Sequence, residues 1–451
     1  MNEKEVQKFD VMRVPDDAST GYLIEVSLEY PAHLHDDHNC LPLCPVKRHV
    51  ADDELSPYAT EIWQQLRGKS KRAKGEKLLC TLEDKERYVL HYRNLKLYLQ
   101  LGMRIKRIHH VLEFYQEAWL KPYIDFNTRK RAEAKTEFER IYYKLMNNSV
   151  FGKLMECQRK HVDVSLTNSE KKLKKLTAKP TFRESRIFNE NLVGVNCKRN
   201  KVLINRPIFA GQTVLDLSKV LMYQFWYGYL KRKYGNQVTL LMSDTDSFLF
   251  HVVTEDIYAD MKKDSHHFDT SEYPTDHFLY SSSNRKIPGK FKDELNGKVA
   301  EKFCGLRSKM YAVCHSTDGE ETETKKAKGI QKATTEKDLR YEMYENVLMD
   351  KTEILSTMDL IRSRKHNLYC ETVTKKSLSP FDDKRYILND GISSLSYGHY
   401  CVNHTSLDPE VCQEYQNRMQ CDTSCATEVP KTERKVTHVR DNSDTYSTTV
   451  S

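Results

Sequence analysis

Two β-rich runs on either side of a short acidic turn constrain the fold of this chain more than any other feature of the sequence. Residues 238–243 and 247–253 are rich in Val, Leu and Phe, and Asp244-Thr245-Asp246 lies between them. Two such runs around a tight polar turn predict a β-hairpin. Ionised carboxylates at the end of buried strands are costly unless a cation or another partner compensates them. The turn therefore predicts a site for a hard cation such as Mg²⁺, which binds one or two carboxylates together with substrate phosphates.

An ordinary turn capped by Asp side chains is the main alternative to a metal site, because Asp is common in turns. A calcium loop that begins at Asp244 would place Glu255 at its twelfth position. Its fifth and sixth positions, however, are Phe248 and Leu249, where such a loop needs an oxygen ligand and a glycine. The sequence excludes the calcium loop and leaves the magnesium site and the plain turn open.

The positive charge of the chain is concentrated in one segment. Lys and Arg number 72 against 64 Asp and Glu, a net charge of +8. Residues 61–160 hold 23 Lys and Arg against 12 Asp and Glu, whereas residues 1–60 hold 5 against 12 and residues 161–451 hold 44 against 40. Such a block favours a polyanionic partner, although solvated helix faces would give the same pattern. The basic run at residues 67–77 predicts an exposed loop, with a nuclear-import signal or a nucleic-acid patch as the less favoured interpretation.

The other periodic patterns predict a mixture of helices and strands. Residues 22–30 alternate as a half-buried strand does, and the Pro-containing residues 31–60 predict irregular structure. Helical spacing predicts a helix over residues 91–117, interrupted at Pro122, and a second helix over residues 129–147 with Asn127 or Thr128 as its cap. Further along, the patterns predict a strand at residues 202–204, an apolar helix at residues 214–230 and a disordered tail past Cys421.

A second candidate site lies near the end of the basic helix. Lys144 and Asn148 are one helical turn apart and share a face, so that an ammonium and an amide could together hold a phosphate and a base or sugar. The alternative is an amphipathic helix that turns Phe138, Ile141 and Leu145 inward and leaves its charges in solvent.

A third candidate site is the stretch Gly305-Leu-Arg307-Ser-Lys309-Met-Tyr311, which the basic residues 325–329 follow. A Lys and a Tyr two positions apart on a strand project to the same face. Lys309 and Tyr311 could therefore hold a sugar-phosphate backbone.

The twelve cysteines are scattered along a chain without a secretory signal, which predicts free thiols in a reducing, intracellular compartment. Two Cys and His clusters are candidate zinc sites, although neither has the paired short spacings of zinc fingers. The first comprises His33, His35, His38, Cys40 and Cys44, and the second comprises His399, Cys401, His404, Cys412, Cys421 and Cys425. No run reaches about 18 apolar residues, so no membrane span is expected.

The order of these motifs resembles that of family B DNA polymerases. Lys144-x-x-x-Asn148-Ser149-x-Phe151-Gly152, then Asp244-Thr-Asp246-Ser, then Lys309-x-Tyr311 are similar to motifs B and C and to the downstream primer-binding motif of that family. The likeness is greatest to the protein-primed polymerases of Polinton/Maverick transposons and related viruses. It extends from about Gly21 to His399 and includes Val89–Leu99, Trp119–Phe126 and Asp382–Gly398.

The resemblance implies a role for each of these residues. Asp246 would be a ligand of the catalytic metals, with Asp244 as its less direct partner. Lys144 would hold the triphosphate, and Asn148 would face the nascent base pair. Phe151, also in the nucleotide-binding set, stands where many relatives have Tyr, so that a hydroxyl contact would be absent. Arg131 and Lys135 are possible further triphosphate contacts. Lys309 and Tyr311 would position the primer, and Ser149 and Gly152 belong to the same DNA-contacting set.

The implied chemistry is nucleotidyl transfer with two Mg²⁺ ions. The implied partners are a DNA primer–template, deoxynucleoside triphosphates and a terminal protein as primer, and the implied location is the nucleus. Because basic residues would contact the DNA backbone, affinity should fall with salt.

One departure from the family pattern is important. Family members carry motif A, an Asp followed by a short Ser/Asn-Leu-Tyr stretch, before the strand predicted at residues 22–30. This motif and the upstream exonuclease domain are missing, and Glu29-Tyr30-Pro31 corresponds to a position downstream of motif A. We therefore expect an N-terminally truncated or decayed polymerase that does not synthesise DNA alone, and a palm sheet with an unpaired edge. A non-catalytic nucleic-acid-binding remnant and a zinc-dependent interaction protein are the alternatives.

The expected fold is α+β, with an antiparallel palm sheet, helical fingers and a small thumb. The expected domains are a partial palm or connecting region at residues 1–91, fingers at 92–152, palm at 153–295, a thumb-like region at 296–400 and a disordered tail at 401–451. The length of 451 residues and the 39% hydrophobic content suit such a multidomain globular chain and exclude the disordered class.

Overall fold

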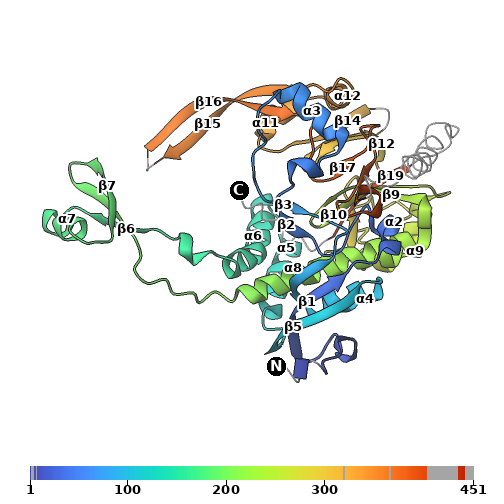
Figure 1. The fold of residues 1–451 in the computed structure, drawn as a ribbon, viewed down its shortest axis with the longest axis horizontal. Helices are drawn as coiled ribbons and strands as arrows, with labels where there is room; N and C mark the ends of the chain where they lie inside the picture. Colours follow the sequence, from blue (N-terminus) through green and yellow to red (C-terminus); the bar gives the residue numbers. More distant parts are fainter. Residues whose placement is uncertain (2–4, 7, 318–319, 365–366, 404–434, 442–451) are drawn as a thin grey trace.

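The computed structural model describes the chain except for residues 2–4, 7, 318–319, 365–366, 404–434 and 442–451 (Figure 1). It is a mixed α+β structure built around small antiparallel sheets, which confirms the expected fold class.

The first sheet has three strands in the order β4-β1-β5. Strand β1 (Thr20–Glu29) confirms the strand predicted at residues 22–30, and it pairs with β4 (Lys85–His91) and β5 (Arg104–Tyr115). The helix predicted over residues 91–117 is correct only for α4 (Tyr92–Gln100). Gly102, at φ +100°, follows this helix, and the chain then returns as β5. The apolar spacing of residues 104–115 is compatible with both the helical and the strand periodicity. This stretch forms a strand because it pairs with β1.

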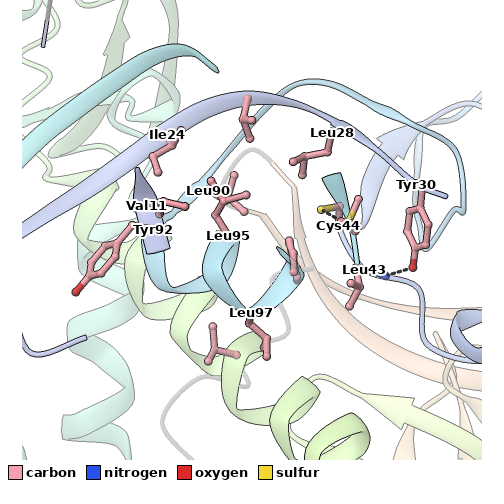
Figure 2. Packing of buried hydrophobic residues seen from close by; sticks show 14 of the residues in the cluster. Val11, Ile24, Leu28, Tyr30, Leu43, Cys44, Leu90, Tyr92, Leu95 and Leu97 are labelled. Carbon is pink, nitrogen blue, oxygen red and sulfur yellow. Dashed lines mark hydrogen bonds between the residues drawn. The ribbon is translucent and has the colours of Figure 1, made fainter. Parts of the chain in front are cut away.

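A hydrophobic core joins this sheet to a long central helix (Figure 2). Helix α8 (Ile208–Tyr223) brings Val220 and Tyr223 into the cluster that contains Ile24 and Leu90. The helix continues as a π-helical segment, η5 (Gln224–Leu230), whose Trp226 is fully buried in a second cluster. The helix predicted at residues 214–230 is therefore confirmed, and it begins six residues earlier than expected.

The second cluster contains the buried side chains of the predicted hairpin. Strands β9 (Val238–Asp244) and β10 (Ser247–Val252) pair in antiparallel register, as the sequence predicts. Phe248 and Phe250 of β10 belong to the same cluster as Trp226. Because α8 and η5 contribute to both clusters, this one helical rod fixes the hairpin relative to the first sheet.

The hairpin belongs to a sheet in the order β14-β13-β12-β19-β10-β9, with β11 (Phe291–Asp293) also paired to β19. The other strands are β12 (Val299–Arg307), β13 (Met310–Thr317), β14 (Glu320–Ala327) and β19 (Lys435–Asp441). Strand β19 corrects one expectation, because part of the tail predicted to be disordered forms this strand. It lies between β10 and β12, with Ser247 opposite Arg440 and Ala300 opposite Val436, and β9 is the last strand of the sheet on the hairpin side.

Two helices form the predicted basic region, with boundaries that differ from the sequence prediction. Helix α5 (Lys121–Glu133) begins beside Pro122, which is favourable in the first turn, and helix α6 (Glu137–Leu154) begins after Thr136. The Thr136 hydroxyl accepts from the backbone N–H of Glu139, whose carboxylate in turn accepts from the N–H of Thr136. This capping box, and not Asn127 or Thr128, starts the second helix.

A separate small unit follows α6, and we name residues 158–206 the basic module. It contains β6 (Asp163–Thr167), α7 (Glu170–Thr177), β7 (Phe182–Asn189) and β8 (Leu192–Cys197), with the sheet order β6-β8-β7. The strand predicted at residues 202–204 is not formed, and this stretch is an irregular connection to α8. Figure 1 shows the module at the end of two extended segments, apart from the rest of the chain.

A long hairpin projects from the sheet region to the same side of the view as the basic module, and it consists of β15 (Ile354–Arg364) and β16 (Asn367–Leu378) (Figure 1). The remaining strands are short: β2 (Val46–Arg48), β3 (Lys77–Leu79), β17 (Tyr386–Ile387) and β18 (Ser394–Leu395). The remaining α-helices are α2 (His35–His38), α3 (Pro57–Arg67), α9 (Lys231–Tyr234), α10 (Ile257–Lys263), α11 (Lys332–Asp338), α12 (Tyr341–Met349) and α13 (Tyr400–Asn403). Single 3₁₀ turns are η1 (Val11–Arg13), η2 (Ala32–Leu34), η3 (Asp52–Glu54), η4 (Gln158–Lys160), η6 (Gly235–Gln237) and η7 (Ser265–His267).

Within the described residues, no helix combines the length and the apolar character that crossing a bilayer requires. The nine cysteines that lie in this part of the chain are all free thiols.

Candidate functional site

The acidic turn lies between two strands that are held in tight register. Asp244 and Ser247 are directly opposite each other, and the backbone N–H of Asp246 donates to the carbonyl of Asp244 at 2.7 Å. Thr245 takes the left-handed conformation, with φ +59°, which lets the chain reverse within two residues. This geometry holds the two aspartates close together at the end of a hairpin whose following residues, such as Phe248, are fully buried.

A lysine from a later hairpin lies against this turn. Lys309 sits in the connection between β12 and β13 with φ +61°, and its Nζ is 3.3 Å from Oδ1 of Asp244. Both side chains are about one-third exposed, so the pair is open to solvent and to a ligand. The structure thus brings together two motifs that the sequence could only place in order along the chain.

Tyr311 packs between the hairpin of β9 and β10 and the hairpin of β12 and β13. Its side chain is 8% exposed and packs in a cluster with Leu249 of β10 and Val313 of β13. Lys309 and Tyr311 therefore differ in their surroundings, because the lysine lies at the surface and the tyrosine lies largely inside. The lysine is accessible to a ligand, whereas the tyrosine packs within the sheet that carries it.

Helix α6 exposes the apolar residues that were expected inside, and it buries or half-buries three of its motif residues. Phe138, Ile141 and Leu145 are 76%, 58% and 57% exposed, so the amphipathic helix with these residues inward is wrong. Phe151 is buried, and Lys144 and Asn148 are partly buried. Oδ1 of Asn148 is buried without a hydrogen-bond partner. An unsatisfied buried acceptor on the predicted nucleotide-binding face is a group that a ligand could satisfy.

The other residues predicted on these helices lie in more open positions. Ser149 is exposed and donates through its hydroxyl to the carbonyl of Met146 at 2.9 Å, and Gly152 is exposed with open space around its Cα. Lys135 is exposed in the connection between α5 and α6, and Arg131 is partly buried on α5.

A loop that the sequence did not single out adds positive charge near these helices. Burial lowers the pKa of Lys286, and the nearby charges of Arg285, Arg131 and Arg140 lower it further. Cations that disfavour one another's charge gain stability from an anion placed among them. The sequence signal is the short basic stretch at residues 285–290, which carries Arg285, Lys286 and Lys290 and lies outside every recognised motif.

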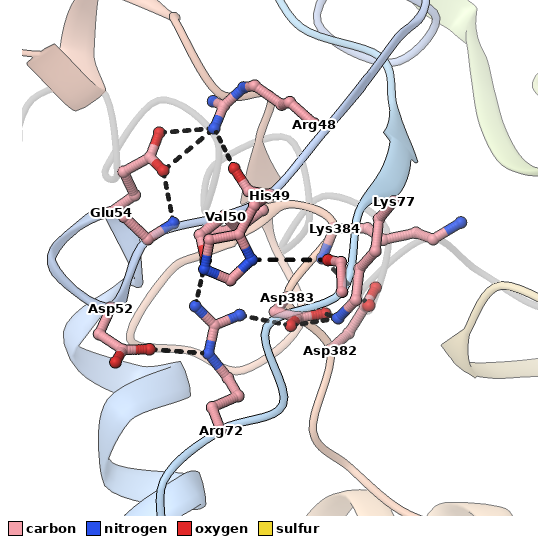
Figure 3. Close-up of polar contacts among 12 residues, drawn as sticks. Arg48, His49, Val50, Asp52, Glu54, Arg72, Lys77, Asp382, Asp383 and Lys384 are labelled. Carbon is pink, nitrogen blue, oxygen red and sulfur yellow. Dashed lines mark hydrogen bonds and ion pairs between the residues drawn. The ribbon is translucent and has the colours of Figure 1, made fainter.

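The basic run at residues 67–77 contains both buried and exposed cations, and Figure 3 shows Arg72 and Lys77 directed at Asp383. Arg72 and Asp383 form an ion pair at 2.7 Å in which both side chains are only 6% exposed, and Lys77 pairs with the same carboxylate. Lys69, Lys71 and Lys74 remain exposed. The exposed-loop prediction therefore holds for these three lysines and is wrong for Arg72, which fastens the loop to the segment that begins at Asp382.

The two candidate zinc clusters meet in space. The rings of His35 and His399 are 5.6 Å apart, and Nε2 of His399 is 3.2 Å from a carboxylate oxygen of Asp36. In the part of the chain that the structure describes, no group of three or more His, Cys, Asp or Glu side chains is arranged to hold a metal ion. His404, Cys412, Cys421 and Cys425 lie outside the described residues.

These buried histidines predict acid sensitivity. Burial lowers the pKa of both His38 and His399 to about 4, from an ordinary value near 6.5. The unfolded chain therefore binds more protons than the folded protein between about pH 6.5 and 4, and stability falls as the pH drops through this window.

We expect His38→Gln to remove up to about 3 kcal/mol of this pH dependence, measured as the free energy of unfolding in urea at pH 7 and pH 4. His33→Gln is the matched control, since His33 is exposed in the same segment. Equal pH dependence in the wild type and in His38→Gln would contradict the assignment.

Comparison with known protein families, with characterised proteins and with solved structures finds no match to this chain.

Proposed function

We propose that this chain is a DNA-directed DNA polymerase of the protein-primed family B type, with an incomplete metal site. The observation that carries the proposal is the contact between Lys309 and Asp244, which unites two of the three motifs at one turn. In this proposal the hairpin of β9 and β10 lies in the palm, α5 and α6 lie in the fingers, and residues 296–400 form a small thumb-like region.

The donor set at the turn fits a magnesium ion. Two carboxylates, from Asp244 and Asp246, together with substrate phosphates are what Mg²⁺ prefers. Bound Mg²⁺ would supply Lewis-acid stabilisation of the charge that develops on the phosphates. The described residues contribute no third carboxylate to the turn. The carboxylates of Asp244 and Asp246 therefore suit one Mg²⁺ ion better than two.

The chain's own residues bind and orient the substrates. Lys144 and Asn148, one turn apart on α6, would hold the triphosphate and face the new base pair. Arg131 and Lys135 would add positive charge around the triphosphate, and Lys286 joins them because Arg131 already influences its pKa. Lys309 would hold the primer backbone beside Asp244, and Ser149 and Gly152 offer an unobstructed helix surface to DNA.

A catalytically inactive DNA-binding remnant is the second candidate. It is favoured by the donor set at the turn, because the described residues bring no third His, Cys, Asp or Glu side chain to the two aspartates. A terminal-protein primer and a nuclear location belong to the polymerase proposal and follow from the resemblance alone.

Ternary-complex formation tests the proposal and separates the two candidates. A labelled primer–template is titrated with the full chain, with Mg²⁺ and with either the complementary or a non-complementary dNTP, and fluorescence anisotropy reports binding. We expect binding that weakens with salt, tightens only with the complementary dNTP and loses this selectivity in Asp246→Ala. Binding that ignores the dNTP identifies the remnant, and no binding at 50 mM salt contradicts both candidates.

Primer extension in the same samples tests the expectation that the metal site is incomplete. With four dNTPs and either Mg²⁺ or Mn²⁺, we expect wild type and Asp246→Ala to be equally inactive. Extension that Asp246→Ala abolishes would show that the two carboxylates of the turn suffice for catalysis.

A further inference from the structure

The basic module carries as much positive charge as the whole chain. Its residues 158–206 include 13 Lys and Arg against 4 Asp and Glu, a surplus of nine, whereas the complete chain has a surplus of eight. The charges of the remaining residues therefore nearly cancel in sum, and the module is, with residues 61–157, one of the two strongly basic regions of the chain. A small unit of this charge favours a polyanion as its partner.

Most of this charge is exposed and lacks a carboxylate partner. Lys174 pairs with Glu170 at 2.7 Å, and Arg206 pairs with Glu156 at 3.0 Å. Among the described residues, the other exposed lysines and arginines of the module take part in no ion pair within 4.0 Å: Arg159, Lys160, Lys171, Lys172, Lys175, Lys179, Arg183, Lys198, Arg199 and Lys201. Charges that the protein does not neutralise internally are available to phosphates.

The module has a core of its own on one face of its sheet. Leu176 of α7 is buried against Val195 and Cys197 of β8, and Leu173 packs beside them. Because side chains alternate along a strand, these contacts assign Val195 to the face that the helix covers and Gly194 and Asn196 to the opposite face.

The opposite face of the sheet is open and carries an aromatic ring. A Cβ atom at Gly194 would come within 2.9 Å of the Phe188 ring and 3.5 Å of Leu166, so both side chains lie across the bare backbone of Gly194. Phe188 is 40% exposed and Leu166 is 56% exposed. The glycine thus allows a flat ring to rest on the middle of the sheet.

A guanidinium group lies beside this ring. Arg186 is directly opposite Gly194 in the sheet, and its Cζ is 5.9 Å from the centroid of Phe188. An exposed aromatic ring next to an arginine on an open sheet is a surface on which unpaired bases stack, while surrounding cations hold the phosphates.

We propose that the basic module binds single-stranded DNA, with bases on Phe188 and Arg186 and the backbone along the exposed lysines and arginines. The choice of DNA over RNA rests on the proposed polymerase function, in which the module would hold unpaired template. A duplex would hide its bases from the sheet, so single strands are the preferred form.

The experiment measures binding of a labelled 20-nucleotide oligo(dT) to the full chain by fluorescence anisotropy. We expect Phe188→Ala to weaken binding about tenfold, since stacking of one base on an aromatic side chain accounts for a change of this size. Phe188→Tyr should restore binding, because it keeps the ring. Phe278→Ala is the matched control, since Phe278 is comparably exposed outside the module.

The charge contribution is tested by salt dependence. Replacing Lys171, Lys172 and Lys175 together with Gln should make the slope of log K against log salt shallower by about 2, as expected for three lost phosphate contacts on a single strand. Replacing Lys8, Lys263 and Lys337, which are exposed elsewhere, should leave the slope within about 0.5 of the wild type. Thermal unfolding of each variant confirms that the fold is intact.

The outcomes separate this inference from the polymerase proposal. If Phe188→Ala binds oligo(dT) as tightly as the wild type, the module is not a single-strand site, whatever the ternary-complex assay shows. If Phe188→Ala loses affinity and Phe188→Tyr regains it while no dNTP selectivity is found, the inference holds and the polymerase proposal fails. An equal preference of the wild type for duplex and single strand would overturn the assignment to unpaired bases.

Discussion

Lys144→Ala is expected to weaken the binding of the complementary dNTP to the complex with primed DNA by roughly 10- to 100-fold, the size of a lost hydrogen bond to a charged group. Lys144 lies on the inward side of α6, one turn before Asn148, whose Oδ1 is buried without a partner. An ammonium at this position donates to phosphate oxygens, and alanine removes both the charge and the donor. The measurement is a titration of the dNTP into the preformed DNA complex, followed by anisotropy.

The matched control for this variant is on the same helix. Lys153→Ala removes an equal charge from α6, but Lys153 is 61% exposed and pairs with Glu156 at the surface. Exposed pairs of this kind contribute little, so we expect less than about a twofold change in dNTP affinity. Equal losses in Lys144→Ala and Lys153→Ala would show that the effect is one of overall charge, and would contradict a specific site at Lys144.

Asp383→Ala is expected to lower the free energy of unfolding by about 3–5 kcal/mol, because it removes the buried partner of the Arg72 guanidinium and leaves only the exposed Asp52 carboxylate. Arg72 and Asp383 are each 6% exposed, and Lys77 bonds the same carboxylate (Figure 3). The ion pairs link the loop at residues 67–77 to the segment after residue 380, so their loss should also increase protease cleavage within the loop. Urea unfolding monitored by tryptophan fluorescence measures the change.

Asp52→Ala provides the comparison, since Asp52 pairs with the same arginine but is 75% exposed. We expect its removal to cost less than about 1 kcal/mol. Equal destabilisation of the two variants would show that burial of the Arg72–Asp383 ion pair does not account for its contribution to the free energy of unfolding.

The effect of Asp383→Ala should depend on pH. Burial alone would raise the pKa of Asp383, but the hydrogen bond and charge of Lys77, together with Arg72, outweigh it and hold the pKa below its ordinary value. A lowered carboxyl pKa stabilises the fold above the unfolded value and loses this contribution as the pH falls through the folded value. The difference between wild type and Asp383→Ala should therefore be largest at neutral pH and shrink below about pH 4.

The sequence was most informative where local pattern alone determines structure. The hairpin around Asp244 was predictable because two β-rich runs and a polar turn need no distant partner. The strand at β1 and the helix at α8 were predictable for the same reason. The motifs that resemble polymerase motifs B and C lie on a helix and at a turn, as expected.

Features that depend on distant partners were not predictable in the same way. Residues 104–115 became β5 because β1 offered an edge, which no local spacing reveals. Phe138 and Ile141 point outward on α6 although their spacing is that of a buried face. Arg72 entered the interior because Asp383, far along the chain, could neutralise it. In each case a tertiary contact overrides a local preference.

The position of β19 has a consequence for how this protein is made. The strand lies between β10 and β12, and its Arg440 is paired with Ser247, a separation from residue 247 to residue 440 that spans 193 positions. At synthesis rates of about 5–20 residues per second, β10 leaves the ribosome roughly 10–40 s before its partner exists. During that interval one edge of the hairpin has no neighbour, and open strand edges pair readily with other chains. The middle of the sheet is thus completed last, and a nascent chain that stalls before residue 435 would display beside its acidic turn the edge that the finished protein covers.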